Sequence, residues 1–104
     1  MEQLNKIEII GRVGHTTAQR YSDKIVTRFS LCSTSLLADK NGSPIIETLW
    51  INVTSWTKEV ISKGMEVKVQ GRLRRVPYSV DTDKGLEERH ALEIYANNVE
   101  IINE

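Results

Sequence analysis

Two tryptophans, Trp50 and Trp56, stand six positions apart in the stretch TLWINVTSW. Side chains alternate between the two faces of a β-strand, so both indoles share one face with Asn52 and Thr54. Leu49, Ile51 and Val53 alternate with these residues, are aliphatic, and predict a core-facing side. Aromatic rings on the outer face of a strand suit stacking on nucleobases, because every base has a π-face. The alternative is a structural role for the indoles, at a barrel end or in a subunit interface.

Arginines occupy matching positions on other predicted strands. The stretch GRLRR puts Arg72 and Arg74 on the non-core face of one strand, and Arg12 and Arg28 fall on the corresponding faces of two others. A basic stripe alone is usually a solvated face. Beside an aromatic strand, however, it combines neutralisation of phosphates with stacking of bases. Asn52 adds a group that can hydrogen-bond a sugar or a base.

No other grouping of residues predicts catalysis or metal binding. His15, His90 and Cys32 are widely spaced and show no metal-ligand pattern, so neither a metal nor another cofactor is expected. The glycines of GRVGHTT lack the Lys-Ser/Thr of a phosphate-binding loop and predict a barrel bend at Gly11 and a turn at Gly14. With no nucleophile–base arrangement in the sequence, we expect that the protein is not an enzyme.

Length and composition predict one globular domain over residues 1–104, with 39% hydrophobic and 27% charged residues. The formal net charge is zero, yet residues 1–80 hold 12 basic and 7 acidic side chains, whereas residues 81–104 hold 2 and 7. A basic surface is therefore compatible with the neutral total. A single cysteine, no signal-peptide pattern and no apolar run of ~20 residues predict a reduced cytoplasmic setting without a membrane.

Hydrophobic alternation predicts five strands, over residues 5–13, 25–34, 45–56, 65–75 and 88–96, the last extending toward residue 102. Two hairpins join some of them. Asn41-Gly42 is a strong signal for a hairpin turn. Residues 78–89 predict a longer hairpin arm that turns near Asp83-Lys84-Gly85.

A short helix is predicted between the third and fourth strands. In TKEVISKG, residues 57–64, Thr57 is a suitable N-cap and Gly64 a suitable C′ residue. Five strands with this helix are the element order of an all-β OB-fold, a Greek-key barrel whose strand faces and loops bind oligonucleotides. A five-stranded sandwich or an SH3-like barrel is the alternative, which the position of the helix disfavours.

The sequence resembles the DNA-binding domain of bacterial single-stranded DNA-binding proteins over residues 5–102. The matching stretches are NKIEIIGRVG, Arg20-Tyr21, VTRFSLCSTS, ETLWINVTSW, KGMEVKVQGRLR and ALEI. The resemblance implies a nucleoid-associated homo-oligomer, generally a tetramer, that wraps single-stranded DNA without sequence preference.

The resemblance also implies roles for individual residues. Trp50 falls where the family has a stacking tryptophan, and Trp56 falls where it usually has a stacking phenylalanine. Tyr78 falls at or near a further stacking tryptophan, at the base of the second arm. Lys58 and Lys63 match basic positions that flank the helix.

Three departures limit what the resemblance implies. Leu37 stands where the family often carries another tryptophan, so one stacking site is expected to be lost. Val76-Pro77 replaces basic residues before the second arm, which weakens phosphate contact there. The sequence ends at Glu104, where family members continue into a tail with an acidic-hydrophobic end. Recruitment of repair enzymes through such a tail is therefore not expected.

The expected function is non-enzymatic binding of single-stranded DNA that protects and organises it in replication, recombination or repair. One alternative is a dimeric primosomal accessory protein of the same fold, which a dimer mass in solution would favour over a tetramer mass. Another is a protein-interaction module whose tryptophan face is buried against a partner. Alanine at Trp50 and Trp56 would then disrupt assembly and leave nucleic-acid affinity unchanged.

Overall fold

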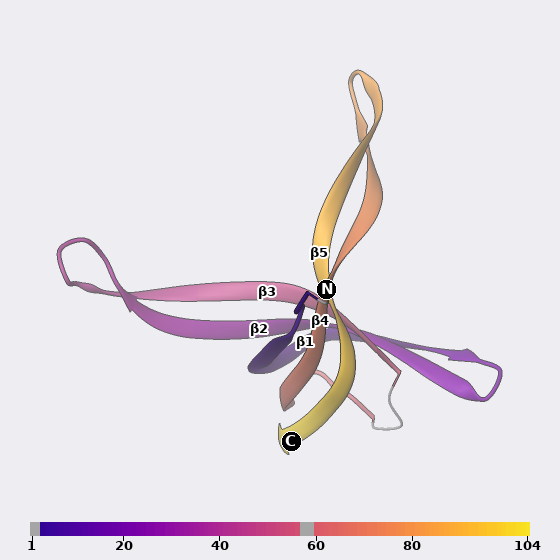
Figure 1. The fold of residues 1–104 in the computed structure, drawn as a ribbon, viewed down its shortest axis with the longest axis horizontal. Helices are drawn as coiled ribbons and strands as arrows, with labels where there is room; N and C mark the ends of the chain where they lie inside the picture. Colours follow the sequence, from indigo (N-terminus) through magenta and orange to yellow (C-terminus); the bar gives the residue numbers. More distant parts are fainter. Residues whose placement is uncertain (1–2, 57–59) are drawn as a thin grey trace.

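The part of the chain that the structure describes forms five β-strands that close into a barrel. A computed structural model describes residues 3–56 and 60–104. The strands are β1 (Ile7–Tyr21), β2 (Lys24–Ala38), β3 (Pro44–Trp56), β4 (Glu66–Thr82) and β5 (Gly85–Asn103). They follow the order β1-β2-β3-β5-β4 around the barrel (Figure 1), with β3 and β5 parallel and the other neighbours antiparallel. This is the five-stranded OB-fold arrangement that the sequence predicts.

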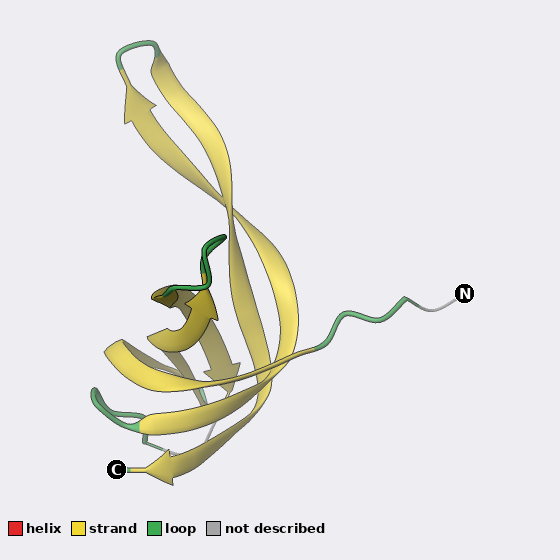
Figure 2. Cartoon of the chain, turned by 90° about the vertical axis from the view of Figure 1, so that its left-hand side faces the viewer, coloured by secondary structure: helices red, strands yellow, loops and turns green. Residues whose placement is uncertain are grey.

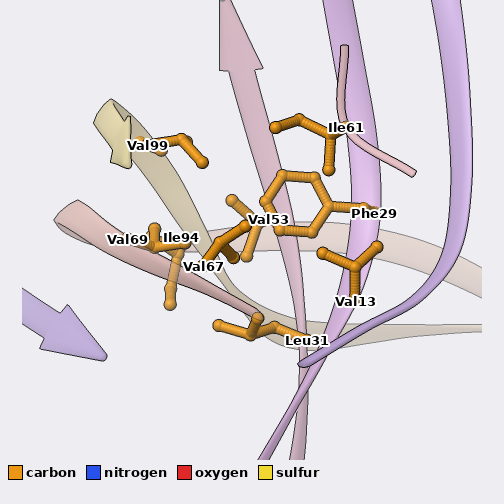
Figure 3. Close-up of a cluster of buried hydrophobic side chains, with 10 residues drawn as sticks. Val13, Phe29, Leu31, Val53, Ile61, Val67, Val69, Ile94 and Val99 are labelled. Carbon is orange, nitrogen blue, oxygen red and sulfur yellow. The ribbon is translucent and has the colours of Figure 1, made fainter. Parts of the chain in front are cut away.

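The core of the barrel is made by inward side chains of each strand together with Ile61, from the segment between β3 and β4 (Figure 3). Its buried members are Val13, Phe29, Leu31, Val53, Ile61, Val67, Val69, Ile94, Ala96 and Val99. Burying a large aliphatic side chain of this kind stabilises a fold by about 1.5–3 kcal/mol. The core-facing side predicted for the third strand is confirmed at Ile51 and Val53, whereas Leu49 on the same side is 46% exposed.

Hairpin arms project from the barrel in three directions (Figure 1). The β2–β3 arm turns through residues 39–43, which include the predicted Asn41-Gly42. The β4–β5 arm turns between Thr82 and Gly85, as predicted, and Figure 2 shows it standing clear of the barrel. Both predicted arms are present and longer than the sequence suggested.

The third arm joins β1 and β2 and was not predicted. Pairing continues as far as Tyr21 and Lys24, with a register shift between Val13 and Thr16. The turn predicted at Gly14 is therefore wrong. Gly14 lies within β1, at the irregularity where the strand leaves the barrel and enters the arm.

The helix predicted over residues 57–64 is wrong in the part that the structure describes. Residues 57–59, with the predicted N-cap Thr57, lie outside the described residues. Residues 60–64 form an irregular segment that ends in a turn at Lys63. The described part of the chain holds no helix, and so none long and apolar enough to cross a membrane.

Contacts with β1 explain why this segment is not helical. The Gly64 N–H donates to the Val13 carbonyl at 2.8 Å, and the Thr16 hydroxyl donates to the Ile61 carbonyl at 3.3 Å. Ile61 itself is buried and joins the core cluster (Figure 3). The Gly64 N–H that donates to Val13 is not available to the carbonyl four residues before it, which a helix would require.

Candidate nucleic-acid interface

Between Trp50 and Trp56, the outward side chains of β3 and their register neighbours on β2, β5 and β4 form one continuous surface, here called the outer face. Trp50 and Trp56 stand at its two ends along β3 and are 60% and 47% exposed. Two rows of register partners cross the strands between them: Ser30, Asn52, Glu93 and Arg74 in one row, and Arg28, Thr54, Tyr95 and Arg72 in the next. Intervening residues such as Val53 and Ile94 are fully buried, which fixes the two rows outward.

A groove of about 370 Å³ lies at the Trp56 end of the outer face. Its lining residues are Tyr21, Val26, Arg28, Thr54, Trp56, Arg74 and Tyr95. The Tyr21 and Trp56 rings are 6.1 Å apart between centroids and tilted by 46°. The Lys24 ammonium lies 5.9 Å from a Trp56 ring centroid. Aromatic surface and positive charge are thus in contact at this end of the face.

The arginines beside Tyr95 keep their charges available. The guanidinium carbons of Arg72 and Arg74 lie 5.7 and 5.8 Å from the Tyr95 ring centroid, within cation–π range. Across residues 3–56 and 60–104, the ion pairs within 4.0 Å include neither of these arginines nor Arg28. These three arginines are exposed and, among the described residues, none of them makes an ion pair within 4.0 Å.

Charges between β1 and β4, outside the outer face, pair with one another. Gln70 donates a hydrogen bond to Glu8 at 2.7 Å, and the Lys68 ammonium lies 3.5 Å from the same carboxylate. These two neighbours lower the pKa of Glu8. Lys68 is thus neutralised, although it shares a strand face with Arg72. In the same described ranges, no cluster of three or more His, Cys, Asp or Glu residues could hold a metal ion.

The Trp50 indole lies against Gly14 of β1, where a larger residue would have to displace side-chain atoms. A Cβ on Gly14 would come within 2.9 Å of the indole Cζ3 and 2.6 Å of the Ser30 Oγ. Ser30 is held in place because its hydroxyl accepts a hydrogen bond from the backbone N–H of His15 at 2.8 Å. The missing side chain at Gly14 therefore gives the indole its place on the face, while most of Trp50 remains exposed.

A second groove, of about 240 Å³, lies between the two tryptophans. Its lining residues are His15, Thr17, Arg28, Phe29, Ser30, Asn52, Val53, Thr54 and Glu93. Phe29 and Val53 are buried core residues, whereas the other lining residues are polar or charged. This middle groove offers both donors and acceptors in the centre of the outer face.

Comparison with known proteins identifies the family. The profile described as the single-strand binding protein family matches residues 4–102. The chain belongs to this family. Proteins named single-stranded DNA-binding protein from Neisseria meningitidis serogroup A and Xanthomonas axonopodis pv. citri are 31% and 29% identical to it over 107 residues. The match covers 95% of this chain and 60% and 58% of those proteins, so the chain spans about 60% of the length of these curated relatives.

Solved structures agree with the family fold. A Plasmodium falciparum SSB in complex with ssDNA superposes with a TM-score of 0.82, at 23% identity, over 99% of this chain and 98% of that one. A small single-stranded DNA-binding protein from Streptomyces coelicolor superposes with a TM-score of 0.69, at 21% identity, over 98% and 96%. These two likenesses establish that the single-strand binding family fold extends over the whole described chain.

Of the site residues that the sequence predicts for this family member, six share the outer face: Arg28, Trp50, Asn52, Trp56, Arg72 and Arg74. Arg12 points elsewhere, since its Nη1 donates to the Gly64 carbonyl at 2.7 Å, beside the turn that holds Lys63. Tyr78 is 46% exposed on the β4–β5 arm and lines neither groove. Lys58 lies outside the described residues.

Sequence reasoning missed several residues of the outer face. Tyr95 alternates with buried Ile94 and Ala96, and this parity alone was enough to place its ring outward. Glu93 lies two residues before Tyr95, so its side chain is placed outward by the same alternation. Tyr21 belongs to the unpredicted β1–β2 arm, so no local signal connected it with Trp56.

Proposed function

We propose that the outer face binds single-stranded DNA without sequence preference, and that the protein protects and organises such DNA in replication, recombination or repair. The observation that carries the proposal is the single strand face on which Trp50 and Trp56 stand exposed at either end of a group of arginines. Relatives named single-stranded DNA-binding protein support it.

Base stacking supplies the sequence-tolerant part of the binding. Trp50 and Trp56 lie about 20 Å apart along an extended strand and each stack on a different base. A stack of this kind contributes about 1–3 kcal/mol. Tyr95 and Tyr21 widen the aromatic surface next to Trp56. Tyr78 offers a further ring to DNA that follows the β4–β5 arm.

Phosphate neutralisation supplies the salt-dependent part. The groups with this role are Arg28, Arg72 and Arg74 on the outer face, together with Arg12, Lys58 and Lys63. Asn52 lies between the tryptophans and hydrogen-bonds a sugar or a base. Stacking without these cations would leave the phosphates unscreened, and cations without aromatic rings would not distinguish single strands from duplex.

Assembly into a homotetramer is part of the proposal. Apolar side chains remain exposed outside the two grooves, among them Ile10 at 50% and Ile102 at 46%. Contact with further copies would cover such surface. Sedimentation in solution separates the possibilities, because a dimer mass would instead favour a primosomal accessory role.

A salt titration with oligo(dT) tests the proposed function. We expect the single-stranded oligonucleotide to quench tryptophan fluorescence and log K to fall with log[salt]. Each phosphate neutralised on a single strand contributes about −0.7 to the slope, so the three outer-face arginines predict a slope of about −2 or steeper. A duplex of the same length serves as the control and binds more weakly. Absence of quenching together with salt-independent affinity would contradict the proposal.

A further inference from the structure

Glu93 places a carboxylate in the centre of a face that is otherwise neutral or basic. In the strand register it lies between Asn52 on β3 and Arg74 on β4. It also lines the middle groove, with Asn52 and Arg28. No ion pair within 4.0 Å joins it to either arginine across residues 3–56 and 60–104. Its oxygens are therefore available to a ligand.

A carboxylate at this point cannot favour a phosphate, since both groups are negative and neither donates. It can accept hydrogen bonds from the edge of a base, and acidic side chains accept from the exocyclic amino group of cytosine. Guanine offers two adjacent donors, N1–H and N2–H, which match the two carboxylate oxygens. Thymine offers only N3–H, flanked by two carbonyl oxygens that repel the carboxylate. A carboxylate at this point therefore binds guanine and cytosine, which present an exocyclic amino group, better than thymine, which does not.

The surroundings of Glu93 suit a base edge. The middle groove has Phe29 and Val53 among its lining residues and polar side chains such as Asn52 around them. The middle groove has a volume of about 240 Å³ and is open to solvent. It lies between Trp50 and Trp56, the two proposed stacking positions on β3. A strand held by the tryptophans at either end would cross this groove.

We propose that Glu93, with Asn52, forms a base-edge subsite that favours bases carrying an exocyclic amino group, guanine foremost, over thymine. This inference rests on the proposed binding of single-stranded DNA and refines it. Stacking and charge neutralisation accept any sequence, and Glu93 adds a base preference at one position. The neighbouring Arg28 and Arg74 hold the flanking phosphates.

The test compares the affinities of an alternating d(TG) oligonucleotide and an oligo(dT) of equal length, by anisotropy at one salt concentration. In Glu93→Gln the amide donates to thymine carbonyls and has lost one acceptor. We expect the affinity ratio of d(TG) to oligo(dT) to fall about five-fold or more, as for loss of a bidentate base contact. Glu93→Ala, which removes the group altogether, lowers the same ratio. Glu100→Gln makes the same charge change on β5 outside both grooves and leaves the ratio unchanged.

Two results would overturn the inference in distinguishable ways. If Glu93→Gln and Glu93→Ala raise both affinities equally, or change neither, Glu93 does not read bases and the inference alone fails. If the wild-type protein binds neither oligonucleotide at low salt, the proposed function fails with it.

Discussion

Replacing both Trp50 and Trp56 with alanine is expected to weaken binding of oligo(dT) by about a hundred-fold or more. Each substitution removes a stacking interaction of about 1–3 kcal/mol, and about 1.4 kcal/mol corresponds to a factor of ten in affinity. The two residues are 60% and 47% exposed, so their truncation leaves no cavity in the barrel core. Because the chain has only these two tryptophans, the measurement is anisotropy of a labelled oligonucleotide.

A matched variant separates loss of the ring from loss of the fold. Phenylalanine at both positions keeps an aromatic surface and is expected to recover most of the lost affinity. Circular dichroism shows whether each variant retains its β-structure. Unchanged affinity in the alanine variant would contradict the stacking role. If that variant also lost its assembly, the tryptophans would instead belong to a protein interface.

The substitution Gly71→Ala is expected to destabilise the barrel by about 3 kcal/mol or more, at the upper end of the cost of overpacking. A Cβ at Gly71 would overlap the backbone carbonyl oxygen of Tyr95 and lie 2.8 Å from the Ala96 Cα. Both obstacles are backbone atoms and cannot turn away as a flexible side chain would. Gly71 pairs with Ala96 in the register, so β4 and β5 would have to separate there.

Thermal unfolding measures this effect. For a domain of this size, about 3 kcal/mol corresponds to a fall in Tm of about 12 °C or more. Ser79→Ala, at an exposed position on the arm of the same strand, is the control and is expected to stay within about 0.5 kcal/mol of the wild type. A fall of less than about 4 °C in the Gly71 variant would mean that β4 and β5 tolerate a wider spacing.

The sequence located the strands well only where one of their faces is buried. Val67 and Val69 on β4 alternate with exposed or half-buried residues, and this period of two is visible in the sequence. In the hairpin arms that extend beyond the barrel, this alternation of buried and exposed residues is absent. Residues 17–21 of β1 and 34–38 of β2 are exposed at every position, because they form two-stranded arms. Cross-strand hydrogen bonds define those segments, and no pattern of burial marks them.

The wrong helix has a different cause. Capping residues are local signals, and a glycine such as Gly64 fits a turn as well as the end of a helix. In the described residues, Gly64 and Ile61 instead make hydrogen bonds to Val13 and Thr16 of β1. These partners are more than forty positions away in the sequence. A local pattern cannot report such contacts.

The candidate site was predicted in part for a similar reason. Periodicity put Trp50, Trp56 and the arginines outward, each on its own strand. The neighbourhood of Tyr95 depends on the parallel pairing of β3 with β5 and on closure of the barrel through β4. Because these pairings join distant segments, the aromatic and basic groups around Tyr95 become one surface only in the folded chain.

The outer face is tested most directly by a ¹⁵N–¹H spectrum recorded while oligo(dT) is added. The two tryptophans give two indole N–H resonances, one at each end of the face. We predict that both indole resonances and the Tyr95 amide shift as DNA binds, whereas the amides of Glu8 and Lys68, between β1 and β4, stay in place. Shifts at Glu8 and Lys68 with both indole resonances unmoved would contradict the account.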